Sequence, residues 1–272
     1  MIKFYLICIF LCAPFFIDAQ VTRKADSLFS ADAYLPARVE YERLLFQHTT
    51  GITNLLILRK SYCFKAEGKY EDDYTTLQLA NFFEEADSLK TKLYYESALN
   101  AYLAGKYDLA FNKVQESQYY LQGTEQPFID LIEILILNQQ HKLADAEKKY
   151  KSFCEKFGIA GKPDIYQNKK LKDPEKAESI SHFLPGIGQW YAGYMGRGIT
   201  SGAIQAGLLL FTAYSFLNGY YFSGAFTGMG LFYMFNNGGA RHAQYLAEKK
   251  NIELVNQINQ TIMISAQEIV KK

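Results

Sequence analysis

The sequence contains little of the material from which metal centres, disulfide frameworks and common catalytic sites are built. Its 272 residues include only 4 cysteines and 4 histidines, which form neither a C-x-x-C pair nor an H-E-x-x-H motif. A Walker-type phosphate loop and a nucleophile elbow are also missing. These absences predict a non-enzymatic protein with no catalytic residues, no metal site and no cofactor, although groups that assemble from distant positions are not excluded by a missing motif.

An excess of one charge is missing too, because 29 Lys and Arg face 28 Asp and Glu. Binding to phosphate backbones needs a basic excess on one face, so we expect no nucleic-acid partner. The charges are unevenly placed: Arg197 is the only formally charged residue between Glu178 and Arg241. The chain therefore joins two different kinds of protein.

Residues 1–19 have the layout of a secretory signal peptide, with one basic residue, an uncharged apolar run and a small residue, Ala19, at the end. Pro14 and the shortness of the run favour cleavage over an uncleaved anchor helix, because a spanning helix needs roughly 20 apolar residues. Cleavage would leave Cys63 and Cys154, which we expect to be free, buried thiols.

Between residues 20 and 158 the chain repeats itself every 36 or 37 residues. The aligned position of the four copies is occupied by Tyr34, Tyr70, Tyr107 and Leu143. Three residues later comes an alanine, or Asp73 in the second copy, and four residues further on comes a large side chain. This spacing lets paired helices approach closely. Gly68 and Gly105 precede two copies, where a tight turn can use positive φ.

The pattern G-x-Y-x-x-A-x-x-x-Y/F resembles the second half of a tetratricopeptide repeat, whose usual period is about 34 residues. The resemblance implies an all-α solenoid of helical hairpins over residues 20–158, whose first helices line a concave groove; an irregular helical bundle is the alternative. Side chains in that groove would bind a protein partner, or would instead fill seams between helices. The groove positions are Tyr62, Lys65, Tyr95, Tyr102 and Asn138.

After a charged linker at residues 159–178 the composition changes, and the 43 residues that follow Arg197 carry no charge. Two helices, near Gly198–Leu217 and Tyr220–Asn237, are each long enough to cross a hydrocarbon core of roughly 30 Å. We therefore expect a transmembrane α-helical hairpin within residues 179–239, with a water-soluble core as the alternative.

Small residues four apart occur in both helices of this hairpin, Gly198 with Gly202 and Gly224 with Gly228. Close packing of helices in lipid relies on such spacing. We expect the two stripes to face each other, or to face another copy of the chain, which leaves a homo-oligomer open. Gln205 is expected to hydrogen-bond across the helices.

The most specific local pattern, S-x-x-L-P-G-x-G-Q-x-Y-x-G, begins at Ser181. It resembles a family of small bacterial membrane domains of unassigned function, which often follows a signal peptide and tetratricopeptide repeats in Bacteroidota. The resemblance covers about residues 179–251. The segment is either a re-entrant turn that contacts a lipid or a partner, or a simple interfacial anchor. Its motif residues are Pro185, Gly186, Gly188, Gln189, Tyr191 and Gly193.

Two signals disagree on the side of the membrane. A signal peptide places the repeats outside the cytoplasm, whereas Arg197 and Arg241 flank the hairpin and would put its flanks inside; we give the export signal more weight. Residues 240–272 are predicted to form an amphipathic helix that lies on the membrane or packs against the repeats.

Together these features predict a membrane-tethered adaptor or assembly scaffold of a bacterial cell envelope. Its repeats would bind a protein partner on the periplasmic side, and its hairpin would lie in the lipid bilayer. The alternative is an oligomeric membrane module for lipid handling or transport, in which the repeats are an accessory domain.

Overall fold

The computed structural model describes five stretches of the chain: residues 22–47, 52–83, 87–122, 126–159 and 163–270. Every regular element in these stretches is helical, which confirms the all-α prediction. The predicted signal peptide lies outside the described residues. The chain forms two compact units, Met1–Phe157 and Gly158–Lys272.

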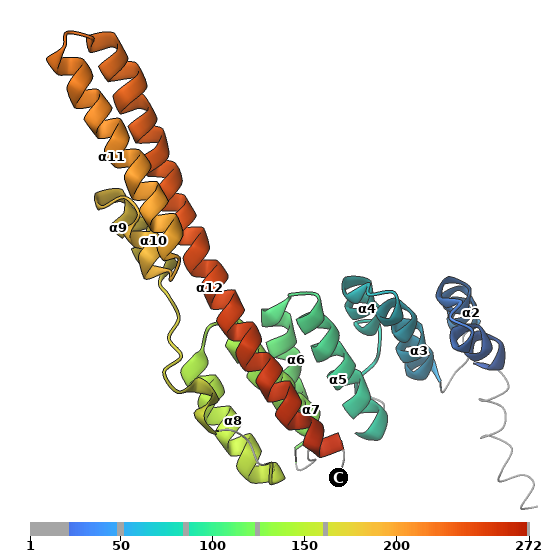
Figure 1. Cartoon of the computed structure of the whole chain (residues 1–272). Helices are drawn as coiled ribbons and strands as arrows, with labels where there is room; N and C mark the ends of the chain where they lie inside the picture. The colour runs from blue at the N-terminus through green and yellow to red at the C-terminus, as the bar shows by residue number, and fades with distance from the viewer. Residues whose placement is uncertain (1–21, 48–51, 84–86, 123–125, 160–162, 271–272) are drawn as a thin grey trace, which may run out of the picture. The chain divides into compact units, whose positions relative to one another are not determined.

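Helical hairpins in sequence order make up the described part of the first unit (Figure 1). Residues 22–30 pair with α2 (Tyr34–Phe46), α3 (Thr53–Ala66) with α4 (Tyr70–Leu77), α5 (Asp87–Leu103) with α6 (Tyr107–Tyr120), and α7 (Pro127–Gln139) with α8 (Leu143–Phe157). Contacts also join α3 to α5 and α5 to α7, so the first helices of successive hairpins lie side by side. This is the tetratricopeptide-like arrangement expected from the repeat.

The second helix of each hairpin begins at the aligned position of the repeat, at Tyr34, Tyr70, Tyr107 and Leu143. The residue two positions earlier always has a left-handed backbone, with φ of 56° at Asp32, 71° at Gly68, 74° at Gly105 and 62° at His141. Glycine adopts this conformation freely, as predicted for two of the turns. Asp32 and His141 adopt it against the steric preference of residues with a Cβ.

The small and large positions of the repeat form the core of the first unit. Between 0% and 2% of the surface is exposed at Ala37, Tyr41, Leu77, Ala110, Val114, Ala146 and Tyr150. Asp73, which replaces the alanine in the second copy, is also 0% exposed. Cys63 and Cys154 are free, as predicted; Cys63 is fully buried, whereas Cys154 is only partly buried.

The second unit contains a short helix η1 (Pro163–Tyr166), then α9 (Pro174–Phe183) and α10 (Ile187–Tyr191), which lie at the base of a long hairpin (Figure 1). The hairpin consists of α11 (Met195–Leu217) and, running antiparallel to it, the π-helix η2 (Ser223–Met229) followed by α12 (Gly230–Val270). Gly219, with φ of 78°, forms the turn. Among the described helices, Met195–Leu217 alone is long and apolar enough to cross a membrane.

The structure differs from the prediction after Asn237, because no helix ends there. α12 continues through Gly238 and Gly239 as one helix of 41 residues. A glycine inside a helix costs only about 1 kcal/mol and blocks nothing sterically, so a pair of glycines without proline does not stop the helix. The predicted second span is thus divided between η2 and the beginning of α12.

The apolar stripe predicted for residues 240–272 lies on this continuous helix. Leu246, Val255, Ile258 and Ile262 are buried, whereas Ile252 is 57% exposed. The side chain of the last predicted member, Ile269, lies outside the described residues.

Candidate functional site

The glycines of the P-G-x-G-Q motif allow α10 to approach its neighbours at backbone distance. Gly186 has φ of 93°, and a Cβ there would lie 2.2 Å from the carbonyl oxygen of Gly198 in α11. A Cβ on Gly188 would lie 2.0 Å from the carbonyl oxygen of Ala177 in α9. No larger residue fits at either position without movement of the backbone.

The polar residues of the motif connect the helices at the base of the hairpin. Gln189 is 1% exposed; its Nε2 donates to the carbonyl oxygen of Gly239 at 2.8 Å, and its Oε1 accepts from Ser181 Oγ at 3.3 Å. The hydroxyl of Tyr191 accepts a hydrogen bond from the backbone N–H of Asp173 at 3.0 Å. The motif is therefore the packing centre of the second unit.

The first glycine stripe packs against this motif rather than against the second stripe. A Cβ on Gly198 would lie 2.1 Å from Trp190, and one on Gly202 would lie 3.1 Å from the carbonyl oxygen of Pro185. Gly193, with φ of 92°, ends the motif as a turn, and apart from its chain neighbours a Cβ there would meet no described residue within 4 Å.

The second stripe packs inside the hairpin, near its turn. A Cβ on Gly224 would lie 3.1 Å from the ring of Phe216, and one on Gly228 would lie 2.2 Å from Oγ1 of Thr212. In an antiparallel hairpin, residues near the turn pair with each other, so these glycines cannot reach the first stripe at the opposite end. The expectation that the two stripes face each other is wrong for this reason.

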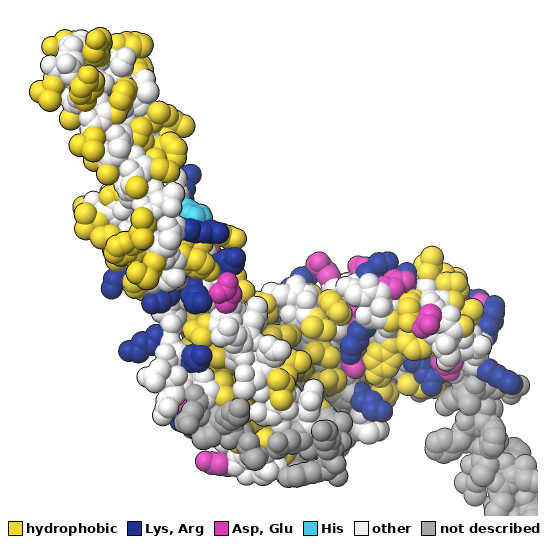
Figure 2. Space-filling view, viewed as in Figure 1, with side chains coloured by type: hydrophobic (Ala, Val, Ile, Leu, Met, Phe, Trp, Pro, Cys, Tyr) yellow, Lys and Arg dark blue, Asp and Glu magenta, His cyan; other side chains and the backbone are white. Residues whose placement is uncertain are grey.

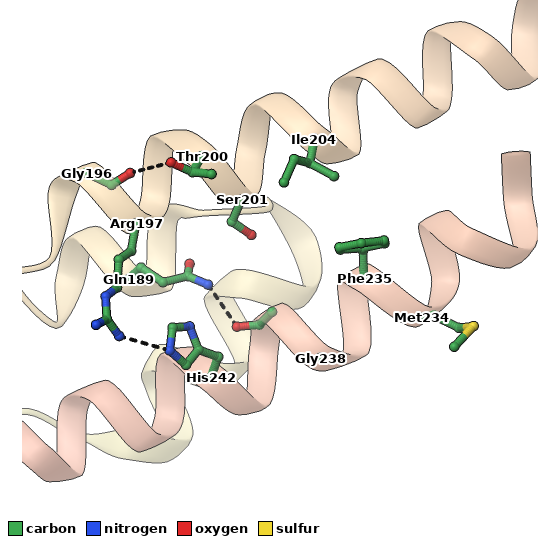
Figure 3. Close-up of a pocket in the computed structure, with 11 residues that line it drawn as sticks. Gln189, Gly196, Arg197, Thr200, Ser201, Ile204, Met234, Phe235, Gly238 and His242 are labelled. Carbon is green, nitrogen blue, oxygen red and sulfur yellow. Dashed lines mark hydrogen bonds between the residues drawn. The ribbon is translucent and has the colours of Figure 1, made fainter.

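A groove of about 720 Å³ opens between α11 and α12 beside the motif (Figure 3). Ser201 and Ile204 of α11 and Phe235 of α12 point into the space between the helices. The lining contains one arginine and one histidine but no carboxylate. It consists of Gln189, Gly196, Arg197, Thr200, Ser201, Ile204, Met234, Phe235, Gly238, Gly239 and His242.

Arg197 and His242 form the charged end of the groove, nearest the base of the hairpin. Arg197 Nη1 lies 3.2 Å from His242 Nε2, and its guanidinium lies 5.7 Å from the centre of the Tyr194 ring. Burial, and then the charge of Arg197, lower the pKa of His242 from 6.5. A neutral imidazole can accept a hydrogen bond at Nε2, which fits this contact. Within the described stretches no carboxylate forms an ion pair with Arg197.

The hydroxyl of Ser201 lies in the middle of the groove. It accepts a hydrogen bond at 3.1 Å from Nε2 of Gln205, which lies one turn further along the same helix. Gln205 thus bonds within its own helix; among the described residues its Oε1 is buried without a partner, so the predicted bond across the helices is not found there. Accepting this bond leaves the hydroxyl hydrogen of Ser201 able to donate to another acceptor.

In the first unit, the structure brings three of the five predicted groove residues together around Glu96. Lys65 Nζ donates to Glu96 Oε2 at 2.6 Å and lies 5.9 Å from the centre of the Tyr62 ring. Burial, and then Glu96, raise the pKa of Tyr62 to about 12. The Tyr95 ring lies 5.8 Å from that of Phe128. These side chains are partly buried and pack against each other.

The other two predicted residues lie elsewhere. The ring centre of Tyr102 lies 5.6 Å from that of Tyr107 in the next helix. Asn138 is 0% exposed, so its side chain is not part of any accessible groove. At these five positions, the structure shows side chains that pack between helices.

A buried carboxyl lies beside this group. Asp73 is 0% exposed, and among the described residues neither of its carboxylate oxygens has a hydrogen-bond partner. Ser61 is near, but its hydroxyl donates to the carbonyl oxygen of Leu58 at 2.9 Å. Burial, and then the charge of Glu96, raise the pKa of Asp73 to about 7, against the opposing effects of Ser61 and Lys65.

No family model, curated protein or solved structure matches the chain. The class of protein is therefore defined by the fold itself: helical-hairpin repeats followed by a helical unit with one helix apolar enough to span a membrane. Sequence reasoning missed the groove of the second unit. Its one signal in the sequence is the isolated charge of Arg197, which antiparallel pairing places opposite His242.

Proposed function

We propose that the protein is a membrane-tethered, non-enzymatic adaptor of a bacterial cell envelope. The hairpin would anchor it in the bilayer, and the repeats, on the periplasmic side, would bind a protein partner. The proposal rests chiefly on the apolar surface of the hairpin.

That surface is exposed on both helices. Leu210, Leu217 and Phe222 are 72%, 87% and 75% exposed, and only 17% of the apolar window of Met195–Leu217 is buried. Figure 2 shows hydrophobic and uncharged groups along the hairpin, with Lys and Arg gathered near its base. Soluble proteins rarely expose so large an apolar surface, whereas helices satisfy their backbone internally and can enter lipid.

Support for the adaptor role comes from an aromatic patch on the first unit. Phe83 and Tyr119 are 73% and 67% exposed, and both rings pack against Tyr120, with centroids 5.5 Å and 5.0 Å apart. Exposed aromatic side chains are enriched at protein interfaces, and stacked hairpins present continuous binding surfaces.

The tether is tested with Trp190, the only tryptophan of the chain, which is 46% exposed. Full-length protein in phosphatidylcholine vesicles should show quenching of its fluorescence when the acyl chains are brominated close to the headgroups, the level at which this residue would lie. The double variant Leu210→Asp with Leu217→Asp should lose this quenching, because charges facing lipid oppose insertion. The matched control, Leu35→Asp with Val39→Asp at positions each 60% exposed on α2, should keep it. An absence of quenching in the unaltered protein would refute the tether.

The adaptor role is tested by purification from gently solubilised membranes. A stoichiometric partner should be recovered with the full chain and lost with Phe83→Ser and Tyr119→Ser, but kept with Leu35→Ser and Val39→Ser. Recovery that survives deletion of residues 21–158 would contradict the proposal.

The side of the membrane on which the repeats lie is measured in intact cells with a cysteine placed at the exposed position Ser152. We expect this cysteine to be protected from a thiol reagent that is confined to the cytoplasm.

The alternative, a lipid-handling or transport module, gains support from the groove between α11 and α12. The glycine stripes no longer support an oligomeric form of this module, because their residues pack within the chain: Gly198, Gly202, Gly224 and Gly228.

A further inference from the structure

The groove between α11 and α12 has a polarity gradient along its length. Arg197 and His242 lie at the end nearest the base, and Ile204, Met234 and Phe235 lie at the end nearest the apolar part of the hairpin. From Arg197 to Ile204 the helix rises about 10 Å, or two turns. A ligand that fills the groove therefore meets a cation at one end and hydrocarbon at the other.

The charged end suits an anion. Arg197 carries five N–H donors, and the described residues provide one hydrogen-bonding contact for them, at His242. No carboxylate lines the groove, so nothing in its wall competes for the guanidinium. Ser201 adds a hydroxyl that accepts a hydrogen bond from Gln205 and can donate its own hydrogen to an anion.

The orientation of the groove relative to the bilayer indicates which kind of anion it binds. If α11 crosses the bilayer, Arg197, at its third residue, lies at the level of the lipid headgroups, and Ile204 lies at the level of the acyl chains. A free anion would use only the first half of this groove. A phospholipid would use both halves in the order in which the bilayer presents them.

We propose that this groove binds one anionic phospholipid, with its phosphate on Arg197 and Ser201 and the first part of an acyl chain between Ile204 and Phe235. The inference rests on the proposed membrane insertion of the hairpin. It assigns to the base of the hairpin a role in selecting lipid, in addition to anchoring.

The test uses full-length protein in phosphatidylcholine vesicles that contain a trace of photoreactive phospholipid. Two probes carry the same reactive acyl chain, one with a phosphatidylglycerol and one with a phosphatidylcholine headgroup, and cross-linked peptides are identified by mass spectrometry. We expect the phosphatidylglycerol probe to label the peptides that contain Ile204 and Phe235 about fivefold more than the phosphatidylcholine probe.

Variants locate the preference in the groove. Arg197→Gln should abolish the difference between probes, and Ser201→Leu, which fills the groove and keeps the charge, should lower labelling by both. Arg241→Gln is the matched control, because Arg241 is exposed and adjacent to His242 but does not line the groove. If Arg241→Gln and Arg197→Gln reduce the preference equally, general surface charge explains it and the proposal is wrong.

Two further outcomes would also overturn it. Competition by inorganic phosphate in solution would show a free-anion site, and a disulfide between two chains that each carry Ile204→Cys would show that a second copy fills the groove. Failure of the tether is recognised separately, because brominated lipid would then not quench Trp190 and neither probe would label the hairpin.

Discussion

Replacing Asp73 by alanine should stabilise the first unit at alkaline pH and remove a large part of its pH dependence. The folded state holds this carboxyl with a pKa of about 7, against 3.8 for a solvated one, chiefly because it is buried. The folded state therefore binds a proton more tightly than the unfolded state. The resulting stability is fully present below pH 3.8 and is lost as the pH rises to about 7.

The size of the effect follows from the shift. One pKa unit corresponds to about 1.4 kcal/mol, so the full shift is worth about 4 kcal/mol, of which about 2 to 3 kcal/mol falls between pH 5 and pH 8. Alanine fits the position, since Ala37, Ala110 and Ala146 occupy it in the other repeats. Relative to the unaltered protein, the free energy of unfolding of Asp73→Ala should therefore rise by roughly this amount between pH 5 and pH 8.

Cys63, fully buried in the same unit, provides the assay. In full-length protein whose other cysteines are replaced, the rate of thiol modification measures transient opening of the repeats. The ratio of rates between the variant and the unaltered protein at one pH gives the difference in free energy. That ratio should change by a factor of about 30 to 100 between the two pH values. Asp72→Ala, on the exposed face of the same helix, should leave the ratio independent of pH. A pH-independent ratio for Asp73→Ala would refute the assigned buried, protonated carboxyl.

Three further predictions concern single positions. His141, with φ of 62°, should be replaceable by glycine with a gain of about 1 kcal/mol, seen as a higher midpoint of thermal unfolding by circular dichroism; a lower midpoint would show that the imidazole holds the turn. Gly188→Ala places a Cβ 2.0 Å from a backbone oxygen and should speed proteolysis at the base of the hairpin, whereas Gly207→Ala, with no atom within 4 Å, should not. The pKa of His242, followed by NMR, should lie below 6.5 and rise in Arg197→Gln, because a nearby positive charge is removed; an unchanged value would leave burial as the only cause.

The repeat could be placed from sequence to the residue, because its signal is redundant. Four features recur together in the copies: a turn, an aligned aromatic residue or leucine, a small residue and a large residue. Each is needed for the same close packing of helices. The second helices accordingly begin at Tyr34, Tyr70, Tyr107 and Leu143. Asp73 departs from the pattern in chemistry but not in burial, since the position remains 0% exposed.

The second unit was less predictable because its outcome depends on pairing between distant segments. Gly238 and Gly239 resemble a helix end in sequence, yet α12 continues through them. The glycine stripes indicated close packing correctly but not the partners, which are the motif for Gly198 and Thr212 for Gly228. The groove depends on the antiparallel register of the hairpin, which no local pattern in the sequence specifies.

The unbroken course of α12 has a mechanical consequence. Its 41 residues form a rod about 60 Å long with no proline inside it. Hydrogen bonds join its successive turns, so a tilt imposed near Gly230 is passed along the rod, and the pair Gly238 and Gly239 is where the helix bends most easily. A tilt of about 10° around the middle of such a rod would move each end by about 5 Å. A tilt at the apolar end of the helix therefore moves its other end, by an amount that depends on the stiffness at this glycine pair.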